Sequence, residues 1–363
     1  MQFQSTTVYL LFTFARCLSP IHHSSFIISQ GVDIMLCITV EKYGTPDQLQ
    51  LQILPTPTVE PDQVLVKVKY AGVNFVDIYE RSGVYSTPLP LIPGKEGVGE
   101  IVAMGSGVKA FHIGQRVGFP YMEQGAYGEY IALCADGLVS LPESICDEVA
   151  ASVLLQGLTA LFLSHETFPL NQQHTVLIHA AAGGVGFLLV QMAKLRGARV
   201  IGTVSSAAKA LLAFQAGADK VIRYDCENFV DGVMDFTAGQ GVDVVYDSVG
   251  LRTFEDSLKA LKNRGLLVAC GQASGEVPPV ALNRLLGCRA SERGSFYLTR
   301  PVIRHYISDA MALKQQASLL FDYLSLGKIQ PPCYQIYSLE QAKEAHYALE
   351  SRQVTGKLLL SCS

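Results

Sequence analysis

Apolar and polar residues alternate along short segments in the first part of the chain, as they do in strands with one buried face. Gly and Pro residues separate these segments and mark turns. This pattern predicts an irregular, β-barrel-like domain over residues 36–157. The predicted strands are Cys37–Val40, Leu49–Ile53, Gln63–Tyr70, Gly97–Ala103, Arg116–Phe119 and Glu129–Ala132.

After Leu155 the pattern changes to alternating strand and helix candidates, which predicts βαβ units and a twisted parallel sheet. From about Arg300 the chain becomes helical and polar, with a long helix expected over Ile307–Leu326. The chain closes on Val354–Leu360, a strand that could rejoin the first domain. The candidates between these regions are 157–163, 176–178, 187–195, 199–204, 207–216, 220–224, 242–246, 253–261 and 265–270.

The segment Ala180–Gly186 joins the buried strand Val176–Ile178 to the helix that follows, and it reads Ala-Ala-Ala-Gly-Gly-Val-Gly. Glycines at such a turn let the backbone approach a pyrophosphate, and the helix N-terminus presents free N–H groups to it. A glycine cluster alone is weak evidence. Between a buried strand and a helix, it predicts a dinucleotide-binding site.

The end of the second strand of this unit decides between the two nicotinamide dinucleotides. An NAD-specific site carries Asp or Glu about 20 residues past the glycines, where it holds the ribose 2′-OH. Here the strand ends Gly202-Thr-Val-Ser-Ser206 without an acidic residue, and Lys209 follows. The hydroxyl of Ser205 and the cation of Lys209 suit a 2′-phosphate, so we expect NADPH. Lys209 alone would be an ordinary solvated helix residue.

Composition limits the class of protein. The 363 residues, 49% of them hydrophobic, suffice for two domains. A net charge of −4 and a pI near 6.1 argue against a nucleic-acid or membrane-surface binder, and no apolar run approaches the roughly 20 residues of a membrane span. The nine cysteines include no C-x-x-C pair, which argues against zinc ribbons and thioredoxin-like motifs. We expect reduced cysteines and a cytoplasmic protein.

The first 34 residues differ from the rest. Val8–Phe14 is apolar, but no Lys or Arg precedes it and Arg16 follows it, unlike the order of a secretory signal. No acidic residue occurs before Asp33, so a weak organelle transit peptide stays open. The simpler interpretation is an over-long start with Met35 as the natural first residue. We expect residues 1–34 to be poorly ordered and not catalytic.

Six motifs stand in order along the chain: Asn74–Tyr85, Gly94–Gly99, Leu155–Thr159, His179–Gly186, Val245–Gly250 and Gly294–Pro301. From about Met35 to its end the chain resembles the NADPH:quinone oxidoreductases, the zeta-crystallin-like, zinc-free branch of the medium-chain dehydrogenases/reductases. The resemblance implies an α/β protein with a GroES-like β-barrel catalytic domain, built from residues 35–157 and 300–363. It also implies a doubly wound, parallel Rossmann sheet over residues 158–299 that binds NADPH, and a homodimer through the Rossmann domains.

The zinc-dependent alcohol dehydrogenases of the same superfamily place a Cys ligand near the position of Asn74 and a His ligand at that of Lys95. A catalytic zinc needs three protein ligands, usually Cys, His or a carboxylate. Asn and Lys cannot replace those two, so we expect no metal. Without a Lewis acid, an acceptor that takes hydride unaided is favoured over an alcohol. Quinones fit, because they accept electrons readily and the cofactor carries the hard chemistry.

The resemblance also implies the residues of the site. Asn74, Tyr79 and Tyr85 would be catalytic and line a cleft beside the nicotinamide. Asn74 would bond the cofactor or the substrate oxygen, and the tyrosines would stack on a quinone or donate to it, although each could be an ordinary packed aromatic. Asp225 departs from the basic residue that relatives can have there. The expected cofactor-binding residues are Asn74, Thr159, Gly183, Gly184, Gly186, Ser205, Lys209, Tyr224, Ser248, Gly271, Gln272 and Arg352.

Two alternative functions stay open. The same zinc-free pocket could deliver hydride to the activated carbon of an alkenal or enone. Zeta-crystallin-like proteins also serve as lens structural proteins and as RNA binders. The mild acidity of the chain and its lack of a basic stripe argue against nucleic acid.

Overall fold

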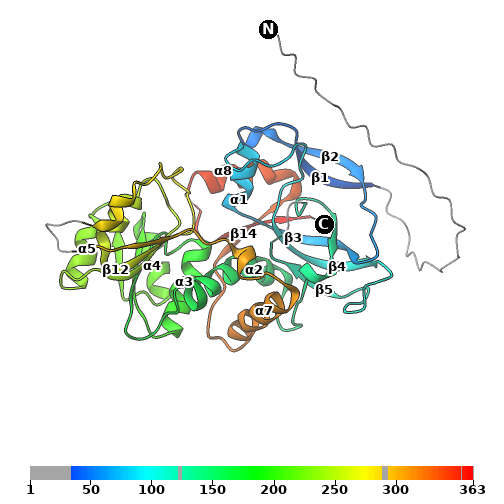
Figure 1. The fold of residues 1–363 in the computed structure, drawn as a ribbon. Helices are drawn as coiled ribbons and strands as arrows, with labels where there is room; N and C mark the ends of the chain where they lie inside the picture. The colour runs from blue at the N-terminus through cyan, green and yellow to red at the C-terminus, as the bar shows by residue number, and fades with distance from the viewer. Residues whose placement is uncertain (1–33, 122–124, 288–292, 353, 363) are drawn as a thin grey trace, which may run out of the picture. The chain divides into compact units, whose positions relative to one another are not determined.

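Two sheets organise the protein. The computed structural model describes residues 34–121, 125–287, 293–352 and 354–362, which belong to one compact unit. We expected residues 1–34 to be poorly ordered. Residues 1–33 lie outside the described part of the chain, and Ile34 is the first residue of the first strand. Figure 1 shows strands β3, β4 and β5 in one half of the drawing and helices α3, α4 and α5 in the other.

The first sheet has seven strands and is mostly antiparallel. A separate two-stranded ribbon precedes it in the chain. Its path runs β14-β15-β3-β4-β5-β7, and β6 also pairs with β3. The ribbon strands are β1 (Ile34–Val40) and β2 (Leu49–Pro55). The sheet strands are β3 (Gln63–Val73), β4 (Glu96–Met104), β5 (Arg116–Phe119), β6 (Tyr130–Cys134), β7 (Val139–Ser140), β14 (Tyr334–Ser338) and β15 (Lys357–Ser361).

Strand β3 is central to this sheet because its alternating pattern gives it one apolar face. Val64, Val66 and Val68 are fully buried, and they alternate with more exposed residues as a period of two requires. The C-terminal strand β15 pairs antiparallel with β3, with Leu359 opposite Gly72. The last strand therefore joins a sheet built by the first part of the chain, as its position in the sequence suggested.

The second sheet has six strands, all parallel, in the order β10-β9-β8-β11-β12-β13. Numbered by their order in the chain, the strands lie as 3-2-1-4-5-6, which is the doubly wound Rossmann order. In this fold the ligand binds at the carboxyl ends of the strands, next to the two central strands where the strand order reverses, here β8 and β11. The strands are β8 (Thr175–Ile178), β9 (Arg199–Val204), β10 (Lys220–Arg223), β11 (Val242–Asp247), β12 (Leu261–Ala269) and β13 (Tyr297–Thr299). Strand β13, at the edge, was not predicted as a strand.

The helices follow the predicted alternation, but their starts differ: two begin earlier than predicted, one begins at the predicted residue 207, and two begin later. They are α1 (Phe75–Ser82), α2 (Asp147–Phe162), α3 (Gly184–Leu195), α4 (Ala207–Gln215), α5 (Phe229–Phe236), α6 (Phe254–Ala260), α7 (Ala310–Ser325) and α8 (Ala342–Glu350). Helix α3 begins three residues before the predicted start, so Gly184 lies in its first turn. Helix α2 starts at Asp147, ten residues before the predicted one, because Asp and Glu in its first turn complement the helix dipole.

Helix α2 continues into a π-helical turn, η3 (Leu163–Thr167). Together, Asp147–Thr167 is long and apolar enough to cross a membrane by length and composition, but 72% of its most apolar window is buried inside the protein. That burial is typical of a core helix. Short 3-10 turns complete the fold: η1 (Pro46–Gln48), η2 (Ala135–Gly137), η4 (Leu282–Leu286), η6 (Ile303–His305) and η7 (Leu339–Gln341).

Candidate active site

The glycine turn lies between β8 and α3, with Gly183 as the residue before the helix and Gly184 and Gly186 in its first turn. A Cβ at Gly186 would lie 2.2 Å from the carbonyl oxygen of Ala180, so only glycine lets the turn close this tightly. A Cβ at Gly184 would lie 2.0 Å from Oε1 of Gln156. That oxygen is buried and has no hydrogen-bond partner. Gln156, which sequence reasoning did not single out, therefore packs against the turn.

The turn also contacts the C-terminal segment, because Gly183 forms an isolated parallel bridge with Gly356. Beyond the end of β9, Ser206 caps α4 by accepting a hydrogen bond from the backbone N–H of Lys209. The Nζ of Lys209 donates to the carbonyl oxygen of Arg352 over 2.6 Å, and burial lowers the pKa of that lysine. The structure thus brings Lys209 and Arg352 together although 143 residues separate them.

Arg352 in turn reaches the loop after β12, where its Nη2 donates to the carbonyl oxygen of Ala273 over 2.5 Å. That loop lies against the loop after β11, since the N–H of Ala273 donates to the carbonyl oxygen of Ser248. A Cβ at Gly271 would lie 2.7 Å from the same Ser248 oxygen. Ser248, Gly271 and Gln272 therefore share one edge of the sheet with Arg352.

Tyr224 follows β10, and its N–H donates to the carbonyl oxygen of Val204 at the end of β9. Its side chain is exposed. On either side of it, Arg223 and Asp225 form an ion pair with 2.7 Å between Nη2 and Oδ2. The carboxylate thus balances the one cation adjacent to Tyr224 in the sequence.

The aromatic loop brings Tyr79 and Tyr85 together, with their ring centroids 5.2 Å apart in an edge-to-face arrangement. The backbone N–H of Gln272 donates to the hydroxyl oxygen of Tyr79 over 3.3 Å, so the loop after β12 touches α1. Burial is the main reason that the pKa of Tyr79 is raised to about 12. Its phenol is therefore neutral at physiological pH and can donate a hydrogen bond.

Arg300 is a residue that sequence reasoning missed. It follows the edge strand β13, and its Nη2 donates to the hydroxyl oxygen of Tyr85 over 3.1 Å and to Oε1 of Gln272 over 2.7 Å. The residue stood within one of the motifs that carry the family resemblance, Gly294–Pro301, but nothing local in that motif indicates partners as distant as Tyr85. Arg300 connects the aromatic loop to the carboxyl edge of the parallel sheet.

Asn74 lies at the start of α1 and is 8% exposed. Its Nδ2 donates to the carbonyl oxygen of Gly72 and to Oε1 of Glu96, and its Oδ1 accepts from Nζ of Lys357 over 2.8 Å. Both amide hydrogens are thus engaged within the chain, and Lys357 holds Oδ1. Lys357 and Glu96 are further residues that sequence reasoning did not place at the site.

Lys95, at the other former zinc position, forms an ion pair with Glu80 over 2.6 Å. The ammonium group of Lys95 contacts Glu80, and the ammonium group of Lys357 and the amide of Asn74 contact Glu96. A zinc site would need Cys, His or free carboxylates at these positions. The donor set does not fit Zn²⁺. In the described part of the chain, no group of three His, Cys, Asp or Glu residues could hold a metal ion.

Thr159, a predicted cofactor-binding residue, and His179, which lies in the motif at the glycine turn, have contacts of a structural kind. The hydroxyl of Thr159 donates to the carbonyl oxygen of Leu155 one turn earlier in α2. His179, in the strand before the glycine turn, has Thr203 within 2.8 Å of Nδ1 and Ser257 within 3.0 Å of Nε2. Ser257 in turn donates to Asp247. The side chains of His179, Ser257 and Asp247 are buried, and Asp247 accepts from backbone N–H groups of the loop after β11, so these hydrogen bonds stabilise that loop.

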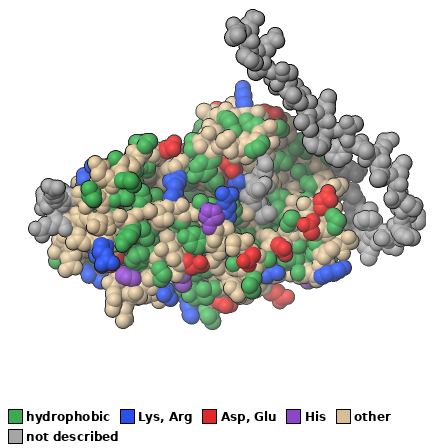
Figure 2. Space-filling model, in the orientation of Figure 1, with side chains coloured by type: hydrophobic (Ala, Val, Ile, Leu, Met, Phe, Trp, Pro, Cys, Tyr) green, Lys and Arg blue, Asp and Glu red, His purple; other side chains and the backbone are tan. Residues whose placement is uncertain are grey.

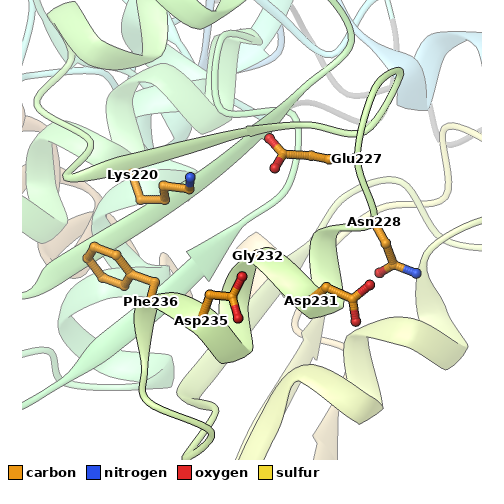
Figure 3. A pocket seen from close by; sticks show the side chains of 7 residues that line it. All are labelled: Lys220, Glu227, Asn228, Asp231, Gly232, Asp235 and Phe236. Atoms are coloured by element: carbon orange, nitrogen blue, oxygen red, sulfur yellow. The ribbon is translucent and has the colours of Figure 1, made fainter.

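A pocket of about 420 Å³ lies elsewhere, between the start of β10 and helix α5 (Figure 3). It is lined by Lys220, Glu227, Asn228, Asp231, Gly232, Asp235 and Phe236. Lys220 is the first residue of β10, so this pocket lies toward the amino end of that strand. None of the predicted site residues lines it.

Family models match both halves of the chain. Residues 60–143 match the alcohol dehydrogenase GroES-like domain, and residues 184–315 match a family described as zinc-binding dehydrogenase. With the Rossmann sheet and its glycine turn, these matches define a medium-chain dehydrogenase/reductase. A quinone oxidoreductase of Pseudomonas aeruginosa is 42% identical over 88% of this chain and 97% of its own length. The chain therefore belongs to the quinone oxidoreductase family.

Solved structures agree with this assignment. The Escherichia coli quinone oxidoreductase complexed with NADPH is 40% identical, with a TM-score of 0.85 over 90% of this chain and 99% of that one. A 2-haloacrylate reductase of a Burkholderia species is 35% identical over 90% of this chain and 99% of its own length. The family thus includes proteins named for two kinds of acceptor.

Proposed function

We propose that this protein is an NADPH-dependent quinone reductase that works without a metal. The observation that carries the proposal is the meeting of Tyr79, Tyr85, Gln272 and Arg300 at the carboxyl edge of the Rossmann sheet. Aromatic rings and hydrogen-bond donors beside a dinucleotide site suit a planar acceptor that carries carbonyl oxygens. The quinone oxidoreductase relatives support the same acceptor class.

The proposed cofactor-binding residues form two groups. Gly183, Gly184 and Gly186, with the free N–H groups at the start of α3, would hold the pyrophosphate. Toward the adenosine end, Ser205, Lys209, Tyr224 and Ser248 would hold the 2′-phosphate and its ribose. Arg352, Gly271 and Gln272 would bind the phosphates and the nicotinamide, and Asn74 and Thr159 complete the proposed set. The bound nicotinamide would supply a hydride.

The chain's own residues would orient the acceptor and exclude water rather than polarise it with a metal. Tyr79, with its raised pKa, keeps its proton and would donate to a quinone oxygen. Asn74, held by Lys357 and Glu96, would act through its fixed position beside the nicotinamide. The misfit between the Asn74, Lys95 and Lys357 side chains and Zn²⁺ supports a zinc-free site.

Two assays test this function. NADPH oxidation is measured against benzoquinones and naphthoquinones, and failure with every quinone tested would refute the proposal. Fluorescence titration should give at least about tenfold tighter binding of NADPH than of NADH, roughly 1.4 kcal/mol. Equal affinities would overturn the assignment of Ser205 and Lys209.

A second candidate, reduction of an activated double bond, is favoured by the relative named 2-haloacrylate reductase. The same hydride position could serve the activated carbon of an alkenal or enone. A comparison of kcat/KM for an enone and a quinone of similar size separates the two functions. A crystallin-like structural role would leave both values negligible while the dinucleotide still binds.

We also propose the division into a GroES-like domain (35–157 and 300–363) and a Rossmann domain (158–299), and a homodimer through the latter. Among the described residues β13 pairs only with β12, and exposed apolar residues stand near its free edge, namely Leu282, Leu286, Tyr297 and Leu298. An unpaired edge with apolar neighbours favours pairing with a second copy. Light scattering of L282E/L286E should then give a monomer where the unchanged protein gives a dimer.

Cytoplasmic location and the lack of a nucleic-acid or membrane partner complete the proposal. The cysteines in the described part of the chain are all free, as suits a reducing compartment. Acidic and basic side chains mix over the face in Figure 2, which does not suit a phosphate-binding stripe. Fusions to a fluorescent protein that begin at Met1 and at Met35 would reveal an organelle signal. A salt-sensitive RNA shift at micromolar protein would contradict the exclusion of nucleic acid.

A further inference from the structure

Arg300 is an exposed cation at the proposed acceptor position. Its two hydrogen bonds, to Tyr85 and Gln272, both come from Nη2 and both go to neutral oxygens. None of the ion pairs among the described residues involves it. Two other cations near the site have a different arrangement, because Lys95 pairs with Glu80 and Lys357 pairs with Glu96. Lys209 and Arg352 donate to backbone carbonyl oxygens instead.

The position of Arg300 separates it from the proposed phosphate-binding groups. Lys209 and Arg352 contact each other and the loop at Ala273, on the side of the glycine turn. Arg300 contacts Gln272 in that same loop but, unlike those two residues, it also contacts the Tyr85 hydroxyl of the aromatic loop. Arg300 and Arg352 both act on Tyr79 electrostatically and favour its ionised form, against the larger effect of burial on its pKa.

A guanidinium binds carboxylates with two parallel hydrogen bonds, and it remains charged at every physiological pH. In the described part of the chain, no hydrogen bond uses Nε or Nη1 of Arg300, so this edge of the guanidinium can take both oxygens of one carboxylate. Nη2 meanwhile holds the group in place through Tyr85 and Gln272.

We propose that Arg300 makes this enzyme selective for acceptors that carry a carboxylate beside the conjugated system, such as acidic quinones and α,β-unsaturated acids. The proposal rests on the reductase function above and narrows its substrate class. The ring or double bond lies by Tyr79 and Tyr85, and the carboxylate meets Arg300. NADPH would supply the hydride to the conjugated carbon or oxygen of the acceptor and would leave as NADP⁺. A proton from solvent completes the two-electron reduction, and the carboxylate itself is unchanged.

The test uses a pair of acceptors of similar shape, 1,4-naphthoquinone-6-carboxylate and its methyl ester. The ester withdraws electrons more strongly, but this intrinsic difference cancels when the acid-to-ester ratio is compared between two proteins. For each protein the ratio of kcat/KM for acid over ester is measured. Arg300→Gln should lower this ratio about tenfold relative to the unchanged protein, because a charge-assisted hydrogen bond is lost. Arg300→Lys keeps a positive charge and should restore part of the ratio.

Arg199→Gln is the control for net charge. Arg199 begins β9, its guanidinium stacks over Phe236, and it has no place in the proposed site, so the acid-to-ester ratio should not change. If Arg300→Gln lowers both rates equally, or raises the KM for NADPH instead, Arg300 does not select the acceptor and the proposal is overturned.

A binding measurement keeps the test independent of turnover. Calorimetry with 2-naphthoate and methyl 2-naphthoate, in the presence of NADP⁺, reports recognition of the carboxylate without reduction. About tenfold weaker binding of 2-naphthoate by Arg300→Gln supports the proposal even if no quinone is reduced, in which case the reductase function fails by itself. Equal binding by the two proteins refutes the role of Arg300.

Discussion

The Nζ of Lys357 lies 2.5 Å from Oε1 of Glu96, and the two side chains are 0% and 1% exposed. Glu96 also accepts from the backbone N–H of Leu155 in α2 through its other oxygen, so strand β4, strand β15 and helix α2 meet at this pair. Asn74 bonds both partners. A buried ion pair of this kind adds little net stability, but it leaves a costly charge when one partner is removed.

Lys357→Met should therefore destabilise the protein by about 3 kcal/mol or more, since Glu96 is left buried without its cation. The double variant K357M/E96Q should recover much of that loss. Urea unfolding measures both. Lys259→Met serves as the control, because Lys259 and Asp256 form an exposed pair whose loss changes stability by less than about 1 kcal/mol. Equal effects of K357M and K259M would contradict the account of the buried pair.

The glycine turn gives a prediction with an internal control. Gly184→Ala places a Cβ against the Gln156 side chain, which can be shortened, whereas Gly186→Ala places one against the backbone oxygen of Ala180, which cannot. We expect both single variants to weaken NADPH binding at least tenfold, and Q156A to restore binding in G184A alone. NADPH fluorescence measures the affinity. Rescue of G186A by Q156A would show that the close contact at Ala180 is not the cause.

The sequence predicts those features whose signal is local. The glycine turn, the run of apolar residues in β8 and the missing acid after β9 lie within 35 residues, and they led to the Rossmann sheet and to NADPH. Arg300 and Lys357 escaped notice because their partners Tyr85 and Asn74 are 215 and 283 residues away in the chain. No periodicity reports such a contact.

The starts of elements were the other weak point. The predicted helix after the turn began at Phe187, where apolar residues first repeat, but α3 begins at Gly184 because its first turn is held by backbone bonds such as that from Phe187 N–H to Gly183 oxygen. The family resemblance implied that Asn74 lies beside the nicotinamide. That resemblance does not tell that Gly72 and Glu96 accept both of its amide hydrogens.

The raised pKa of Tyr79 predicts how quinone reduction depends on pH. With a pKa of about 12, its phenol stays protonated between pH 6 and 9, so it imposes no inflection on kcat/KM there. Tyr79→Phe removes the acceptor of the Gln272 N–H and should lower kcat/KM about fivefold, near 1 kcal/mol, without changing the shape of the profile. An inflection near pH 8 that disappears in Y79F would mean that the phenol ionises during turnover.

Asp225 offers a change that should strengthen cofactor binding. It pairs with Arg223 next to Tyr224, and both members are about one-third exposed. Asp225→Asn frees the guanidinium for the 2′-phosphate, so NADPH affinity should rise about threefold or more while NADH affinity does not change. Lys209→Gln should have the opposite effect on NADPH. A D225N protein that binds both dinucleotides more tightly would contradict a specific role at the 2′-phosphate.

His346 predicts a loss of stability in acid. It is buried on α8, its Nε2 lies 3.0 Å from the hydroxyl of Tyr127, and burial, with the nearby charge of Arg81, lowers its pKa to about 3. Between pH 6.5 and 3 the unfolded chain binds a proton there that the folded protein does not bind. The contribution of the neutral imidazole to stability is therefore complete above pH 6.5. Below that pH, and down to about pH 3, the free energy of unfolding falls by about 1.4 kcal/mol per pH unit.

Asp77, which accepts from the same Tyr127 hydroxyl, acts in the opposite sense. Burial raises its pKa to about 7, so the folded protein binds an extra proton between pH 3.8 and 7 and gains stability as the pH falls through that range. The comparison with His346→Gln isolates the histidine. Between pH 6.5 and 5.5 the unchanged protein should lose about 1 kcal/mol more than H346Q in urea unfolding, because the unfolded histidine is only half protonated at pH 6.5. Parallel pH dependences of the two proteins would show that His346 is protonated in the folded state.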